Sequence, residues 1–92
     1  MDEPCLSPHL PIPQTGCQRL VWLPPGDSSR VRVLAWTCDC RSVFFELCHA
    51  GGMAFIRRTV QKRKAPEVTE THRMGVAEGR QVWQAILVGM AR

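Results

Sequence analysis

The strongest constraint on the fold is an apolar stripe near the C-terminus that repeats with the period of an α-helix. Its members are spaced by three, three, one, three, one and three residues: Val76, Gly79, Val82, Trp83, Ile86, Leu87 and Met90. Gly79 lies within the stripe, where the lack of a side chain permits close approach to a packed surface. The spacing predicts one helix over about residues 74–91, with its apolar side packed against another layer of the same chain.

The sequence before this helix alternates like β-strands and is broken by turn-forming residues. Residues 20–23 and 31–36 flank a Pro-Pro-Gly-Asp-Ser-Ser run, which predicts a hairpin with Val31 and Val33 in the core. Residues 42–48 and 53–60 flank Gly51 and Gly52, which tolerate positive φ and predict a second hairpin. Residues 68–71 fit a brief edge strand. The expected class is therefore α+β: a small antiparallel sheet of three to five strands, a meander of hairpins, packed against one C-terminal helix.

The chain length allows one small domain. With 92 residues and 10.4 kDa, a second core would have nothing to bury. Residues 1–15 are rich in proline and predict a flexible N-terminal arm, with residues 16–92 as the single domain. The apolar runs are only a few residues long, whereas a membrane-spanning helix needs roughly 18 or more. An acidic start in place of the basic start of a secretory signal favours a cytoplasmic location without a membrane partner.

Catalytic patterns are missing from the sequence. The nearest candidate for a nucleophile is Cys48 with His49 or His72 as base, but consecutive residues of a strand point to opposite faces, so Cys48 and His49 cannot pair there. The sequence has no phosphate loop, nucleotide fingerprint or paired carboxylates, and nothing indicates a small-molecule substrate. We expect a non-enzymatic binding protein.

Five cysteines are an odd number in a chain without an export signal, which favours reduced thiols over a disulfide framework. If Leu23 pairs with Arg30 in the first hairpin, Cys17 comes to the same end of the sheet as Cys38 and Cys40. Three sulfurs there need a fourth ligand to form a tetrahedral zinc site, and the arm offers Cys5 or His9. The alternative is that no cofactor is bound and the thiols are buried or partly buried groups.

Charge suggests an anionic partner. The formal net charge is +4, and five cations lie between residues 53 and 66 without an acid: Arg57, Arg58, Lys62, Arg63 and Lys64. Such a cluster favours largely non-specific contacts with the phosphates of nucleic acid. The alternative is a solvated basic loop that prevents the edges of sheets from associating.

A second interpretation rests on apolar side chains that alternation places opposite the core positions Val31, Val33 and Phe45. They are Trp22, Leu34, Trp36 and Phe44. Because one helix covers one face of a sheet, these residues would form an exposed patch for a protein partner or for a second copy of the chain. A small zinc-stabilised domain is a further alternative.

Three short runs also resemble a known family. They are Phe44-Phe45-Glu46-Leu47 with the turn Gly51-Gly52, Phe55-Ile56-Arg57-Arg58-Thr59, and Ala77-Glu78-Gly79-Arg80-Gln81-Val82-Trp83. This order is similar to the strand, glycine turn, strand and helix of the arm-type DNA-binding domains of tyrosine recombinases, over about residues 43–87. The resemblance implies a small sheet that enters the major groove with a helix packed behind it. The chain departs from the family in a longer loop over residues 61–71 and in His49 where the turn has a basic residue.

Overall fold

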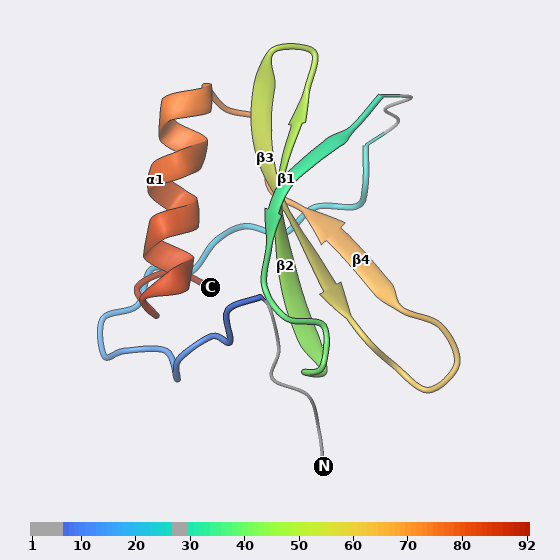
Figure 1. The fold of residues 1–92 in the computed structure, drawn as a ribbon, viewed down its shortest axis with the longest axis vertical. Helices are drawn as coiled ribbons and strands as arrows, with labels where there is room; N and C mark the ends of the chain where they lie inside the picture. Colours follow the sequence, from blue (N-terminus) through green and yellow to red (C-terminus); the bar gives the residue numbers. More distant parts are fainter. Residues whose placement is uncertain (1–6, 27–29) are drawn as a thin grey trace.

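A computed structural model describes residues 7–26 and 30–92 and shows two layers, a sheet and one helix (Figure 1). The sheet is antiparallel with the order β1-β2-β3-β4, formed by β1 (Arg32–Trp36), β2 (Val43–Ala50), β3 (Met53–Val60) and β4 (Glu67–Glu70). The helix α1 (Val76–Leu87) lies against one face of this sheet. The α+β class predicted from the sequence is confirmed. No helix in the described part of the chain is long and apolar enough to cross a membrane.

The central hairpin of β2 and β3 has the expected turn. The two strands pair in register from Val43 opposite Val60 to Ala50 opposite Met53. Gly51 and Gly52 connect them with φ of +59° and +78°, a conformation in which a Cβ atom would be strained. The second hairpin predicted from the sequence is therefore present.

The first predicted hairpin is wrong. Residues 20–23 do not form a strand beside β1; Leu23 instead lies beside β4, where its N–H donates to the Glu70 carbonyl at 2.7 Å and its carbonyl accepts from the Glu70 N–H at 2.8 Å. β4 pairs with β3 along only one side, so its other edge offers backbone groups that Leu23 satisfies. Pro24 and Pro25 follow directly and have no N–H with which to extend a ladder.

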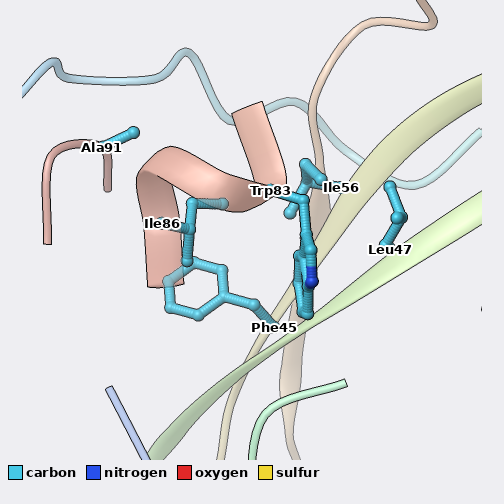
Figure 2. Packing of buried hydrophobic residues seen from close by; sticks show 6 residues of the cluster. All are labelled: Phe45, Leu47, Ile56, Trp83, Ile86 and Ala91. Atoms are coloured by element: carbon cyan, nitrogen blue, oxygen red, sulfur yellow. The ribbon is translucent and has the colours of Figure 1, made fainter. Parts of the chain in front are cut away.

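The main core lies between the sheet and α1. Figure 2 shows Trp83 and Ile86 of α1 directed toward the strands, with Ile86 next to Phe45. The buried cluster consists of Phe45, Leu47, Ile56, Trp83, Ile86 and Ala91. At Gly79 a Cβ would lie 2.5 Å from the Cβ of Ala54 in β3, so the glycine is what allows α1 to approach the sheet this closely.

A second, smaller cluster lies on the opposite face of the sheet. It consists of Cys48, Ala50 and Phe55, with Val31 and Val33 packed against it. The two valines expected in the core are thus half-buried, and they pack on the face away from α1. Alternation predicted correctly that they share a face, but the core that they join is the smaller one.

The N-terminal segment runs past the C-terminal end of α1 (Figure 1). The Gln14 N–H donates to the Gly89 carbonyl, and the Gln18 N–H donates to the Met90 carbonyl, both at 2.8 Å. α1 itself is shorter than the expected 74–91, because the chain leaves the helix before Gly89, whose φ is +79°. The described part of the arm therefore lies along the domain, and its flexibility stays a prediction.

Candidate functional site

A pocket lies between the N-terminal segment and the part of the main core that is formed by the beginning of β2 and the last residues of β3. Its volume is about 380 Å³. Its apolar lining is formed by Leu10, Pro11, Pro13, Leu20, Trp22, Val43 and Phe45. The remaining described lining residues are Ser42 and four arginines, Arg19, Arg41, Arg58 and Arg92, and none is Asp or Glu. The pocket thus combines an apolar floor with positive charge.

Trp22, Phe45 and Arg58 form a packed group in this pocket. The Trp22 and Phe45 rings have centroids 5.7 Å apart and are tilted by 45°. The Arg58 Cζ lies 5.4 Å from the Trp22 ring centroid, within the range of cation–π attraction. Since Trp22 packs on Phe45, the prediction that it projects from the opposite face is wrong; it rested on the hairpin that does not form.

Arg92 has a structural task within the same pocket. Its guanidinium donates to the carbonyls of Pro11, Ile86 and Ala91, and so joins the N-terminal segment to the end of α1. Its Cζ lies 5.9 Å from the Phe45 ring centroid. Burial lowers the pKa of Arg92 from its usual value, an effect opposed by the nearby Cys17. Arg19 and Arg41 are exposed, which leaves them accessible to a ligand.

The structure separates the five cations of the predicted basic cluster. Arg57 lies on the face away from α1, with Nη1 3.5 Å from a Glu46 carboxylate oxygen and Nε 3.7 Å from a Glu70 carboxylate oxygen. Lys62 donates to the Glu67 carboxylate, and this contact lowers the pKa of Glu67. Arg63 and Lys64 are exposed in the β3–β4 loop. Of the five, Arg58 alone lines the pocket in the described part of the chain.

The β3–β4 loop begins at the rim of the pocket. The Gln61 N–H donates to the Ser42 carbonyl at 2.7 Å, and its side-chain amide donates to the carbonyls of Asp39 and Arg41. Arg63 and Lys64 follow two and three positions later. Sequence reasoning missed Arg19, Arg41 and Arg92 because they are far apart along the chain, and only the excess of arginine over acid hinted at them.

The other predicted surface residues remain partly accessible. Trp36 is 54% exposed and Leu34 is 40% exposed, whereas Phe44 is half-buried. Trp36 lies opposite Glu46, two residues along β2 from Phe44, so both project from the face away from α1. The prediction that Trp36 projects opposite Val31 and Val33 is wrong, because the register shifts between Val33 and Ala35 and places Trp36 on the same face as the two valines.

A second candidate site lies in the β1–β2 connection. The ligand atoms of His9, Cys38 and Cys40 all lie within 4.8 Å of one another, and His9 Nε2 is 3.1 Å from Cys40 Sγ. The predicted set was Cys17, Cys38 and Cys40 with a fourth ligand from the arm. Cys17 is outside the cluster, because the backbone of its neighbour Gln18 pairs with Ala91 near the C-terminus. His9 is one of the two arm residues that the sequence offered as a ligand. The other, Cys5, lies outside the described residues.

Comparisons with protein-family models, with curated proteins and with solved structures found no match.

Proposed function

We propose that this protein is a non-enzymatic module that binds single-stranded nucleic acid at the pocket of Arg58 and Trp22. The observation that supports this function best is the pairing of an aromatic floor with four arginines, of which Arg19 and Arg41 are exposed, while none of the described lining residues is Asp or Glu. Flat bases stack on aromatic side chains, and arginine binds phosphate through two parallel hydrogen bonds. A nucleotide presents both groups at once.

The shape of the site favours a single strand over a duplex. The pocket volume of about 380 Å³ falls in the range of sites that enclose a small flat group. In a duplex the bases are stacked inside, whereas an unpaired base can enter such a pocket. Arg63 and Lys64 are exposed in the loop that begins at the rim, and we expect them to contact further phosphates of the strand.

The mode implied by the recombinase resemblance uses a different surface. There the sheet would enter the major groove, and the sheet face away from α1 would contact the duplex. On this face Arg57 is engaged by Glu46 and Glu70, and the two carboxylates would repel a phosphate backbone. This contrast supports the pocket as the nucleic-acid surface, and a duplex serves as the comparison in the test.

The test is a titration of reduced protein into a labelled single strand, the matching duplex and a mononucleotide at about 50 and 200 mM salt. We expect the single strand to bind most tightly, to quench tryptophan fluorescence through Trp22, and to lose affinity steeply at the higher salt. The mononucleotide distinguishes a strand from a free nucleotide, which offers the same base and phosphate chemistry. Equal or tighter binding of the duplex would contradict the proposal.

Two variants remove one charge each from different places. Arg41→Met removes an exposed cation of the pocket, whereas Arg80→Met removes an exposed cation of α1 that does not line it. A hydrogen bond to a charged group is worth about 1.5–3 kcal/mol, so Arg41→Met should weaken binding by about tenfold or more. Arg80→Met should change affinity by less than about twofold, as a distant charge is screened at these salt concentrations. Equal losses would show that only net charge matters.

A protein partner is the second candidate, because Trp36 is 54% exposed on the sheet face away from α1. An apolar contact there persists or strengthens at high salt, unlike phosphate binding. Self-association that survives about 0.5 M salt, in sedimentation velocity, and is abolished by Trp36→Ser would support this function. A monomer at all salt concentrations would exclude the homodimer.

A further inference from the structure

The cluster of His9, Cys38 and Cys40 has the chemistry of a zinc site. In a tetrahedral site with Zn–S near 2.3 Å and Zn–N near 2.0–2.1 Å, ligand atoms are separated by about 3.5–3.8 Å. The three ligand atoms lie within 4.8 Å of one another, so small side-chain rotations suffice to reach that spacing. We propose that these three residues bind a zinc ion that fixes the N-terminal segment to the β1–β2 connection.

Hydrogen bonds of the backbone and a turn bring the three ligand residues together without the help of a metal ion. The Cys38 N–H donates to the Pro8 carbonyl at 2.9 Å, which brings His9 beside the connection. Residues 39 and 40 form a turn, so the two sulfurs of the Cys-x-Cys pair converge on one side. The Gln61 side chain also holds this turn, because its amide donates to the Asp39 and Arg41 carbonyls. The site is therefore largely preorganised.

The donor set selects zinc over harder cations. Two thiolates and one imidazole nitrogen are ligands that zinc prefers, whereas magnesium and calcium prefer oxygen. On binding, each thiol releases its proton to water and His9 coordinates as the neutral imidazole. The sequence also offers a third thiol as a fourth ligand, because Cys5, which lies outside the described residues, precedes His9 by four positions.

The site would connect two walls of the pocket. His9 immediately precedes Leu10 and Pro11, and Cys40 immediately precedes Arg41, and these neighbours line the pocket. Zinc bound between His9 and Cys40 would therefore hold the apolar wall against the basic wall. This inference does not depend on the proposed function, because it concerns the metal and the fold and not the ligand of the pocket.

The experiment measures zinc content by mass spectrometry after purification under reducing conditions with zinc and removal of loosely bound metal. We expect about one zinc per chain, a thermal midpoint that a chelator lowers, and thiolate-to-metal charge-transfer absorption when cobalt replaces zinc. Substoichiometric zinc together with a melting transition indifferent to the chelator would overturn the proposal.

Variants then assign the ligands. Cys40→Ser and His9→Ala change exposed side chains, and each should lower zinc affinity about 10-fold or more while circular dichroism shows a folded protein. Cys17→Ser is the matched control, since this cysteine is outside the cluster, and it should retain zinc. Equal loss of zinc in Cys17→Ser and Cys40→Ser would overturn the assignment. Arg41→Met should retain zinc even where it weakens oligonucleotide binding, which separates the two proposals.

Discussion

Arg57 and Arg58 are consecutive residues of β3, yet they lie on opposite faces of the sheet in very different surroundings. Arg57 meets a carboxylate from each neighbouring strand, because Glu46 and Glu70 occupy the facing positions of β2 and β4. Arg58 lies over Trp22 in a pocket with three other arginines. The face away from α1 neutralises its arginine, whereas the pocket on the α1 face accumulates positive charge.

This difference shows why a run of cations in a sequence is a weak guide to a binding surface. Alternation along β3 determines the face on which each arginine lies. The register of β2 and β4 determines whether an acidic residue lies opposite it on that face. The four arginines that line the pocket instead come from parts of the chain that are far apart in the sequence. The two faces therefore also differ in how they respond to substitution, and four predictions test that difference.

The largest expected effect compares two tryptophans. Trp83 is 6% exposed between α1 and the sheet, whereas Trp36 is 54% exposed on the other face. Trp83→Ala should lower the free energy of unfolding by about 3–5 kcal/mol, as expected for truncation of a core aromatic. Trp36→Ala should cost less than about 1 kcal/mol. Urea denaturation followed by circular dichroism measures both.

Similar losses in the two variants would remove the distinction between a covered and an open face. They would indicate that Trp36 is buried in solution by a partner or a second copy. Sedimentation velocity on the Trp36→Ala variant provides the control, because a loss of stability through lost association is accompanied by a smaller particle.

The sequence predicted the local pattern of this fold better than its long-range contacts. The helical stripe with Trp83 and the turn at Gly51 and Gly52 were both predicted from residues close together in the chain. The predicted hairpin of residues 20–23 and 31–36 does not form, because two strand-like segments around a turn do not reveal that the free edge of β4 competes for Leu23. The same error put Cys17 beside Cys38 and Cys40, whereas its neighbour Gln18 pairs with Ala91 and Cys17 is outside the cluster.

For the candidate sites too, the sequence predicted local arrangements better than long-range contacts. Cys38 and Cys40 were identified because only Asp39 separates them in the sequence, and His9 was one of the two ligands that the arm offered beside Cys5. The pocket could not be predicted, since its arginines come from four separate segments. Long-range contacts bring those segments together, among them the pairing of β2 with β3, of Leu23 with β4 and of Gln18 with Ala91 near the C-terminus.

The second prediction tests whether the face away from α1 is open along its whole length. Cys48 is fully buried there, and burial raises the pKa of its thiol from 9.0 to about 11, against the lowering influence of Arg57. The native protein therefore retains this proton between pH 9 and 11 while the unfolded chain loses it. Stability should fall across this window, by an amount on the order of 2–3 kcal/mol.

Cys48→Ala supplies the control for that measurement. The other thiols and the lysines titrate in the same range, so the informative quantity is the difference in pH dependence between the native chain and the variant. The variant should lose less stability from pH 9 to 11. Parallel curves would show that Cys48 is open to water and that this part of the face is not covered.

The third prediction separates the two arginines directly. Arg57→Met leaves Glu46 and the largely buried Glu70 without their cation and should lower the free energy of unfolding by about 1–2 kcal/mol. Arg58→Met keeps an aliphatic stem over Trp22 and should cost less stability, but it should weaken binding of a single strand by about tenfold. The paired readouts are denaturation and anisotropy. A reversed order of the two variants in either assay would contradict the assignment of their faces.

The smallest effect concerns how closely α1 approaches the sheet. In Gly79→Ala the new Cβ would lie 2.5 Å from the Cβ of Ala54, so α1 or β3 must shift. Overpacking costs about 1–3 kcal/mol, and the better helix propensity of alanine returns about 1 kcal/mol, which leaves a net loss of about 1 kcal/mol. The exchange of the two residues in Gly79→Ala/Ala54→Gly removes the clash while it keeps the gain in helix propensity. The double variant should therefore be more stable than the sum of the two single changes predicts, by about 1 kcal/mol or more in a double-mutant cycle. Additive changes would mean that α1 does not contact β3 at Gly79, and that the two layers are held together by the cluster of Trp83 and Ile56.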